Sequence, residues 1–139
     1  MNLLFLLTPK AACAYVREED TIRQALERMG ASRFSAVPIL AKDGSYRGTL
    51  TEGDLLWAIK NMFLMDMKAA ESHGIMEIQH RRDNEAVPVT TRVEDLLHKA
   101  VDQNFVPVVD DKGAFIGIIT RKAIMQHCMK TYFSATEKQ

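Results

Sequence analysis

The stretch that decides the fold occurs twice in this chain, first as Ser35-Ala-Val-Pro-Ile-Leu40 and again as Asn104-Phe-Val-Pro-Val-Val109. Pro38 and Pro107 occupy the same place in the two copies and lie 69 positions apart. The same offset joins three further pairs downstream: Gly44 and Gly113, Gly48 and Gly117, and Thr51 and Thr120. Four matched landmarks in one register are poorly explained by chance, so the sequence predicts an internal repeat.

The repeat continues upstream of the prolines as a helical pattern. Apolar residues at helical spacing recur 71 positions later: Ile22, Ala25, Leu26 and Met29 match Val93, Leu96, Leu97 and Ala100. The difference between the two offsets places a two-residue deletion just before the second proline. This spacing of apolar residues is typical of an amphipathic helix with one buried face.

Each repeat is predicted to fold as strand, helix, strand, strand and helix, which makes the fold class α/β (α+β). The first four elements are expected at 13–16, 21–30, 36–40 and 46–50, and again at 86–89, 93–103, 105–109 and 114–119. A glycine-containing turn separates the two hairpin strands in each repeat. The last helix is expected to begin at Thr51 or Thr120, because a threonine hydroxyl is a good N-cap.

These elements predict a division of the chain into a first repeat (8–66), a helical linker (67–82), a second repeat (83–133) and a flexible tail (134–139). A long helical stretch is expected from Leu55 to about Met76. Because methionine packs adaptably, its methionines are expected to fill the core or a dimer seam. They are Met62, Met65, Met67 and Met76.

Composition limits the possible functions. The chain has 139 residues, 47% of them hydrophobic, with 18 Lys and Arg against 18 Asp and Glu. This is ordinary globular usage, and zero net charge gives no global attraction to nucleic acid or anionic lipid. No stretch approaches the roughly 20 apolar residues of a membrane span. Two distant cysteines, Cys13 and Cys128, suit free thiols in a reducing compartment, and the four histidines lack metal-ligand spacing. The sequence therefore predicts a cytoplasmic protein without a metal, a membrane or a nucleic-acid partner.

The tandem units, with their pattern of Val-Pro, two glycines and Thr-x-x-Asp, resemble a pair of CBS domains, the Bateman module. The resemblance covers about Thr8 to Lys130 and includes no catalytic domain. It implies two repeats related by pseudo-two-fold symmetry and pairing of two chains as a disc-like homodimer. It also implies a regulatory protein that binds adenosine-containing ligands in clefts between its repeats.

The first repeat carries the motif Thr51-Glu-Gly-Asp54, which has two interpretations. In the functional one, Asp54 accepts hydrogen bonds from the two hydroxyls of a ribose diol, while Thr51 and the helix N-terminus face a phosphate. In the structural one, Asp54 completes a capping box and bonds a backbone N–H. The sequence leaves both open.

The second repeat has Thr120-Arg-Lys-Ala123 at the same positions, so Ala123 replaces the acid. Arg121 and Lys122 then stand in the first turn of a helix, where the macrodipole disfavours cations. This placement suggests that an anion compensates them. Two cations without a carboxylate suit the phosphodiesters of a cyclic dinucleotide, whereas Asp54 suits the free diol of AMP.

The chain is also similar to small stand-alone CBS proteins that bind cyclic di-AMP, through its segments 10–16, 34–38 and Thr120-Arg-Lys. This likeness implies a nucleotide site formed by Lys10, Ala12, Ser35, Ala36, Thr120, Arg121 and Lys122. A second candidate cleft would contain Thr51, Asp54, Val87 and Phe105. At the cleft wall, small Ala36 leaves room for a base where the second repeat has bulky Phe105. Lys122 stands where those proteins usually have arginine, which costs bidentate geometry.

The leading hypothesis is a non-catalytic module that binds an adenine nucleotide, cyclic di-AMP in particular, and controls a protein partner. By the likeness, that partner is a metabolic or stringent-response enzyme. One alternative is a sensor of AMP, ADP or ATP that uses Asp54, and another is a dimerisation or interaction module without a ligand. Enzymatic activity is disfavoured, because the sequence has neither a recognisable nucleophile elbow nor a glycine-rich phosphate loop. No resident cofactor is expected.

Overall fold

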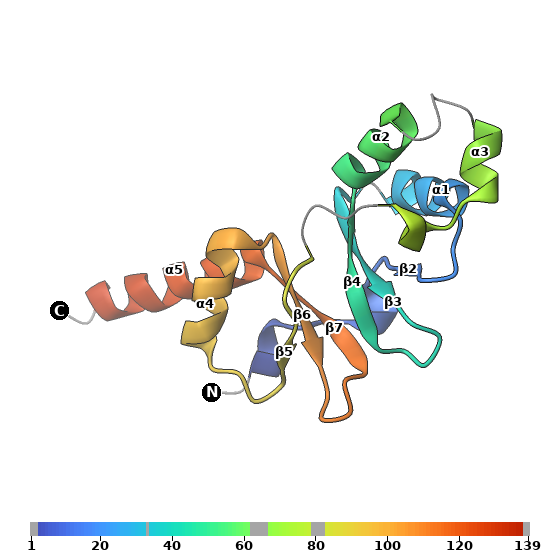
Figure 1. Cartoon of the computed structure of the whole chain (residues 1–139). Helices are drawn as coiled ribbons and strands as arrows, with labels where there is room; N and C mark the ends of the chain where they lie inside the picture. The colour runs from blue at the N-terminus through green and yellow to red at the C-terminus, as the bar shows by residue number, and fades with distance from the viewer. Residues whose placement is uncertain (1–2, 33, 62–66, 79–82, 138–139) are drawn as a thin grey trace. The chain divides into compact units, whose positions relative to one another are not determined.

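The structure is a computed structural model that describes residues 3–32, 34–61, 67–78 and 83–137. The chain folds as two compact units (Figure 1). One comprises Ala14–Asp83 and is called the repeat 1 unit below. The other, the repeat 2 unit, joins Met1–Cys13 to Asn84–Gln139. The predicted mixed fold with two tandem repeats is confirmed.

The repeat 1 unit is a small sheet with helices packed on it. Its strands have the order β2-β3-β4, with β2 parallel to β3 and β3 antiparallel to β4. In chain order its elements are β2 (Val16–Arg17), α1 (Ile22–Ser32), β3 (Ala36–Leu40), β4 (Tyr46–Thr51), α2 (Glu52–Asn61), α3 (Met67–Ser72) and the 3-10 turn η3 (Ile75–Glu77). Helix α1 begins where Thr21 and Gln24 form a reciprocal capping box, with hydrogen bonds of 3.1 and 2.8 Å.

The repeat 2 unit has the same core plan with an added strand at its edge. The sheet order is β1-β7-β6-β5, and β1 pairs antiparallel with β7. Its elements are the 3-10 turn η1 (Leu3–Leu6), β1 (Thr8–Pro9), the 3-10 turn η2 (Lys10–Ala12), β5 (Val87–Pro88), α4 (Val93–Asp102), β6 (Phe105–Val109), β7 (Phe115–Thr120) and α5 (Arg121–Glu137). The first strand of the chain therefore completes the sheet of the second repeat.

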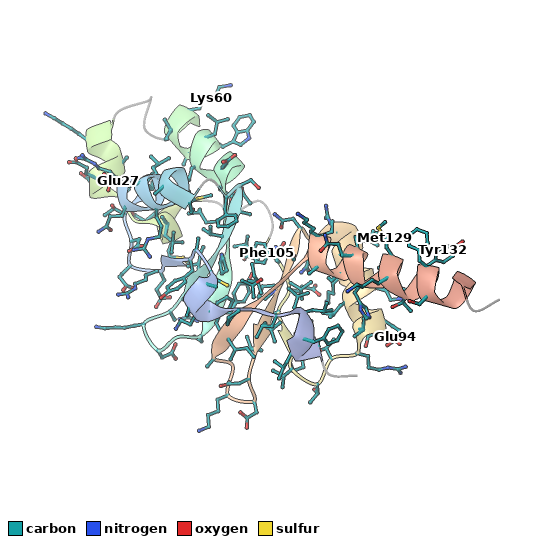
Figure 2. All side chains as sticks on the ribbon, turned by 180° about the vertical axis from the view of Figure 1, so that it is seen from behind. Glu27, Lys60, Glu94, Phe105, Met129 and Tyr132 are labelled. Carbon is teal, nitrogen blue, oxygen red and sulfur yellow. The ribbon has the colours of Figure 1, made fainter. Side chains whose placement is uncertain are left out.

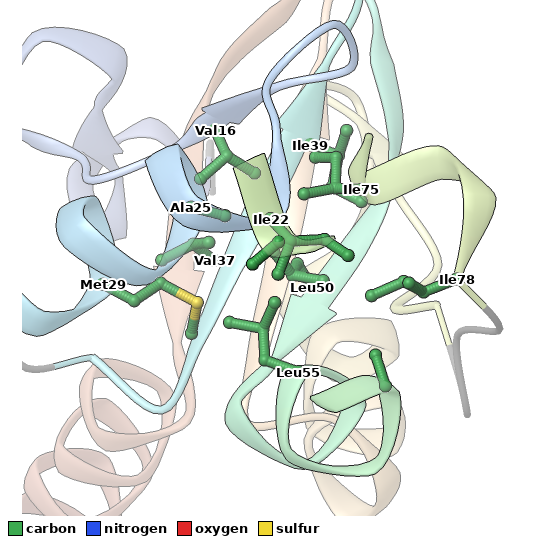
Figure 3. Close-up of a cluster of buried hydrophobic side chains, with 12 residues drawn as sticks. Val16, Ile22, Ala25, Met29, Val37, Ile39, Leu50, Leu55, Ile75 and Ile78 are labelled. Atoms are coloured by element: carbon green, nitrogen blue, oxygen red, sulfur yellow. The ribbon is translucent and has the colours of Figure 1, made fainter. Parts of the chain in front are cut away.

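Each unit has its own hydrophobic core. In the repeat 1 unit, Ile22 of α1, Leu50 of β4 and Leu55 of α2 meet in one cluster (Figure 3). Full burial of one such side chain contributes about 1.5–3 kcal/mol of transfer free energy. In the repeat 2 unit, Leu96 of α4 and Ile119 of β7 are fully buried in a second cluster. The predicted helical pattern identifies the buried residues Leu96 and Ala100 of α4, whereas Leu97, which was predicted on the same face, is 41% exposed.

The two repeats match down to the register of single residue pairs in their sheets. Val16 pairs with Ile39 in one unit and Val87 with Val108 in the other, at the predicted offsets of 71 and 69. Both hairpin turns use a glycine with positive φ, 89° at Gly44 and 83° at Gly113, a conformation that glycine adopts at little cost. The internal repeat is confirmed.

At Gly117, the added strand approaches β7 so closely that a side chain would not fit. A Cβ atom there would lie 2.3 Å from the carbonyl oxygen of Thr8 and 2.9 Å from a methyl carbon of Leu7. In the repeat 1 unit, a Cβ on Gly48 would meet the Asp83 carboxylate at 2.6 Å. Asp83 also accepts a 2.8 Å hydrogen bond from the Thr49 N–H. The two matched glycines therefore allow another segment of the same unit to lie against each hairpin, a following segment at Gly48 and a preceding one at Gly117.

Some sequence predictions differ from the structure. The expected helix from Leu55 to Met76 is not continuous, because α3 ends at Ser72 and η3 begins only at Ile75. Gly74 lies in this break, with an extended backbone that pairs with Thr21. Met76 is 49% exposed and lies outside the core. Met62 and Met65 lie outside the described residues, as does the side chain of Met67.

The boundaries of the units also differ from the predicted division. Residues 8–13, which were assigned to the first repeat, belong to the repeat 2 unit because β1 pairs with β7. Residues 67–78 of the predicted linker belong to the repeat 1 unit, where Ile75 and Ile78 enter its core. Helix α5 continues to Glu137, so residues 134–137 of the predicted tail are helical.

Candidate functional site

In both repeats, the candidate residues lie where a hairpin strand passes directly into a helix. The Thr51 hydroxyl accepts a 3.0 Å hydrogen bond from the Asp54 N–H, and the Thr120 hydroxyl accepts one of 3.1 Å from the Ala123 N–H. These hydroxyls satisfy backbone donors that a helix start leaves without an intrahelical partner. Thr51 and Thr120 are therefore the N-caps of α2 and α5, as predicted.

A second bond fixes each helix start to the preceding strand. The N–H of Glu52 donates to the Ser35 carbonyl, and the N–H of Arg121 donates to the Asn104 carbonyl, both at 2.9 Å. Ala36 pairs directly with Thr51 across the hairpin. The repeat 1 unit thus brings together four of the predicted residues, Ser35, Ala36, Thr51 and Asp54.

Asp54 has the structural role that the sequence offered as one of its two interpretations. Its Oδ2 accepts a 3.0 Å hydrogen bond from the Thr51 N–H, which completes a reciprocal capping box. The side chain is only 2% exposed. This buried bond anchors the start of α2, and a role of Asp54 in binding a ribose diol stays a prediction.

In the repeat 2 unit, Arg121 makes a contact that the sequence does not reveal. Its Nε donates a 2.8 Å hydrogen bond to the carbonyl oxygen of Ala100, in the last turn of α4. A helix C-terminus carries partial negative charge, so it favours this cation. The sequence predicts that an anion offsets the charge of Arg121 at the start of α5. The carbonyl end of α4 provides part of that negative charge.

Part of the cationic pair remains available to a ligand. The terminal nitrogens of the Arg121 guanidinium have no hydrogen-bond partner among the described residues, and Arg121 is exposed. Lys122 is also exposed and makes no ion pair within the described ranges. The matched positions in the repeat 1 unit are Glu52 and Gly53, and Asp54 stands opposite Ala123, so the two helix starts differ by two positive and two negative charges.

Lys10 and Ala12 lie in η2, which contacts β7 of the same unit. The predicted nucleotide site therefore divides into five residues of the repeat 2 unit, namely Lys10, Ala12, Thr120, Arg121 and Lys122, and the remaining two, Ser35 and Ala36, of the repeat 1 unit. The residues of the second candidate cleft are divided as well, with Thr51 and Asp54 in the repeat 1 unit and Val87 and Phe105 in the repeat 2 unit.

A buried polar network beside the start of β6 was missed at the sequence level. Asn84 and Gln103 both donate to the Phe105 carbonyl, at 3.1 and 3.3 Å, and Phe105 itself is buried. Gln103 also exchanges hydrogen bonds of 2.9 and 3.2 Å with the backbone of Glu85. In the sequence these residues look like ordinary polar linker and helix-end positions. The network holds the entry to the second repeat against its sheet.

The Cys13 thiol is not activated for nucleophilic chemistry. Burial raises the pKa of Cys13, so the thiol form predominates at neutral pH. Its Sγ lies 3.3 Å from the carbonyl of Pro9 and 3.4 Å from that of Thr8. Within the described part of the chain, no group of three or more His, Cys, Asp or Glu side chains could hold a metal ion.

A family model also matches the chain, twice, in agreement with the internal repeat. The model described as CBS domain matches residues 8–61 and again residues 75–130. The chain belongs to the CBS domain family. Most of each match lies in one unit, but residues 8–13 of the first match lie in the repeat 2 unit and residues 75–83 of the second lie in the repeat 1 unit.

Three similar proteins illustrate the relationship. A CBS domain-containing protein of Dictyostelium discoideum is 26% identical over 125 residues, which are 81% of each chain. CbpB of Listeria monocytogenes, solved in complex with cyclic di-AMP, is 21% identical with a TM-score of 0.81, over 94% of this chain and 97% of that one. CBSX2, solved in complex with AMP, is 19% identical with a TM-score of 0.74, over 94% and 98%. At these identities, the solved structures establish the shared CBS fold.

No helix in the described ranges of this CBS protein is long and apolar enough to cross a membrane.

Proposed function

We propose that this CBS protein is a non-catalytic regulatory module that binds an adenine nucleotide, cyclic di-AMP above all, and thereby controls a partner protein. The observation that carries the proposal is the cationic start of α5. There, Lys122 and the terminal nitrogens of Arg121 have no partner among the described side chains, and both residues are exposed. A cation pair beside capped backbone N–H groups is suited to a phosphate.

The chemistry of the two helix starts favours a phosphodiester over a mononucleotide. Cyclic di-AMP offers two phosphodiester charges and no free ribose diol. Arg121 and Lys122 suit those charges, whereas the carboxylate suited to a diol, Asp54, is buried and bonded to the Thr51 N–H. The ligand bound by CbpB supports this choice, and the AMP bound by CBSX2 supports the alternative of an adenylate sensor.

Self-association is part of the proposed function. Leu56 of α2 and Met125 of α5 occupy matched positions of the repeat and are both exposed. On α4, Leu97 and Val101 are exposed one helical turn apart. Apolar side chains at matched places on the helices suit a symmetric contact between two copies. We therefore expect a homodimer that presents a surface to a metabolic or stringent-response enzyme in only one ligand state.

Calorimetric titration of the full chain with cyclic di-AMP, AMP and ATP tests the ligand. We expect cyclic di-AMP to bind at least tenfold more tightly than AMP, a difference of about 1.4 kcal/mol. Preference for AMP or ATP would instead assign the protein to sensing adenylate energy state. If none of the three nucleotides binds, the protein is an interaction module without this ligand, and the proposal is overturned.

Asp54→Ala is expected to destabilise the protein without weakening cyclic di-AMP binding. Removing the capping-box carboxylate costs about 1 kcal/mol of unfolding free energy. Asp54→Asn is the matched control, because its amide oxygen still accepts from the Thr51 N–H while the charge is lost. Urea unfolding and calorimetry of both variants give the two quantities. Equal loss of AMP and cyclic di-AMP affinity in folded Asp54→Asn would contradict the assignment of different roles to the two helix starts.

A further inference from the structure

Helix α5 extends beyond the part of the chain that matches the CBS domain. The match ends at residue 130, and α5 continues for seven more residues to Glu137. Figure 1 shows the helix running outward from its unit towards the C-terminus. Two aromatic residues in this extension are largely exposed, Tyr132 at 66% and Phe133 at 54%.

Helix α5, including Phe133 and Ser134 of this extension, forms one side of a groove within the repeat 2 unit. The groove measures about 800 Å³, and its other side is the turn η1. Among its lining residues are Phe5 and Leu6 from η1 and His127, Lys130 and Phe133 from α5. The 3-10 turn is held in place because Leu3 is fully buried in the core of the unit. The Phe5 ring packs edge-on against His127, with 5.0 Å between ring centres.

The groove combines apolar walls with positive charge. Lys130 and His127 are the basic residues that line it, and among the described lining residues there is no acid. Along its length, α5 carries three cations, Arg121, Lys122 and Lys130, and one carboxylate, Glu137 at its end. Gln126 and Ser134 add neutral hydrogen-bonding groups to the wall. An occupant of complementary chemistry has an apolar face flanked by Asp or Glu.

The groove adjoins the surface proposed for self-association on α5. With 100° between successive residues, Met125 is about 160° from Ala123 but only about 40° from Met129, and both Ala123 and Met129 line the groove. Met125 and Tyr132 do not line it. Figure 2 shows Tyr132 on the outer part of the helix. A second copy that covers Met125 would therefore lie at the edge of the groove, next to Met129.

We infer that this groove is the docking site of the regulated partner, which places an acidic amphipathic helix between η1 and α5. The inference rests on the proposed regulatory function, because it assigns the surface through which the module acts. Helices bind such grooves through apolar anchors one turn apart, and Phe133 and Phe5 provide aromatic contacts for them. The same helix carries Arg121 and Lys122 in its first turn, directly before Ala123 of the groove, so ligand and partner would contact neighbouring parts of one element.

The test uses the full chain and a designed fluorescent peptide of about 18 residues, five helical turns, with Leu and Phe on one face and Glu elsewhere. We expect saturable binding by fluorescence anisotropy, weakened roughly tenfold or more by Phe133→Ser. Lys130→Glu is expected to weaken binding of the acidic peptide and to strengthen binding of a peptide with Lys in place of Glu. Val101→Ser, an exposed apolar position on α4 that does not line the groove, is the control and should change the affinity less than twofold.

Several outcomes would overturn the inference. Equal binding of the acidic and basic peptides would contradict the preference for an acidic partner. Unchanged peptide binding by Phe133→Ser would contradict the role of the groove as the docking site. Conversion of a dimer to a monomer by Phe133→Ser, measured by light scattering, would assign the groove to a second copy. Phe133-dependent binding to vesicles of phosphatidylcholine and phosphatidylserine in equal parts would assign it to a membrane surface. Calorimetric titration of Phe133→Ser with cyclic di-AMP separates this inference from the nucleotide proposal. The nucleotide proposal requires that this variant bind cyclic di-AMP, whereas the docking inference does not.

Discussion

Arg121→Ala is expected to weaken cyclic di-AMP binding by about 1.5–3 kcal/mol, the scale of a charge-assisted hydrogen bond. The guanidinium uses Nε to hold the Ala100 carbonyl, so its planar fork is already oriented before a ligand arrives. Such preorganisation limits the side-chain entropy that binding has to overcome. Calorimetric titration of the variant against the natural chain measures the loss.

Arg121→Lys and Lys122→Ala are the controls for this prediction. Lysine at position 121 keeps the charge but removes the Nε bond to Ala100 and the bidentate geometry, so an intermediate loss is expected. Lys122→Ala removes a charge without touching α4. Because Arg121→Ala also releases the last turn of α4, its thermal unfolding is measured without ligand. Undiminished affinity in a folded Arg121→Ala protein would place the phosphate elsewhere.

Gly117→Ala is expected to lower the unfolding free energy by about 1–3 kcal/mol, the cost of overpacking a close contact. Its Cβ would lie 2.3 Å from the Thr8 carbonyl oxygen, a backbone atom that moves only if β1 shifts away from β7. Urea unfolding measures the loss. Hydrogen exchange at the N–H groups of the β1–β7 pair should accelerate as the strand loosens.

Gly30→Ala provides a comparison of opposite sign. Gly30 lies in α1, and an added Cβ there has no neighbour within 4 Å. Alanine has the higher helix propensity, so a gain of about 0.5–1 kcal/mol is expected. If Gly117→Ala proved as stable as the natural chain, the close approach of β1 would not be a feature of the protein in solution.

Most of the fold could be predicted because its signals are local. The strands Ala36–Leu40 and Phe105–Val109 are found as predicted, since a short apolar run bounded by polar turns defines each of them. The helix starts at Thr51 and Thr120 follow from the chemistry of a single hydroxyl. The break at Gly74 was missed because apolar and helix-favouring residues surround it, and it depends on pairing with distant Thr21.

The features that escaped prediction depend on contacts between segments far apart in sequence. Nothing near Thr8 indicates that it pairs with Ile118, because pairing of an edge strand is decided by the sheet that receives it. The contact of Arg121 with Ala100 requires α4 and α5 to be packed first. For Asp54, one motif encodes both a cap and a ligand contact, and only the structure reveals the bond to Thr51.

The crossing of β1 onto the second repeat has a consequence for biosynthesis. A ribosome that has made residues 14–83 has released everything that the core of the repeat 1 unit needs. The first thirteen residues, in contrast, belong to a sheet whose strands β6 and β7 emerge about a hundred residues later. Residues 8–9 therefore wait for their partner strand until about a hundred further residues have been made, with the nearby apolar run at Leu3–Leu7 exposed in the meantime. A bulky group inserted directly before Leu3 would thus impair the folding of the second repeat rather than the first.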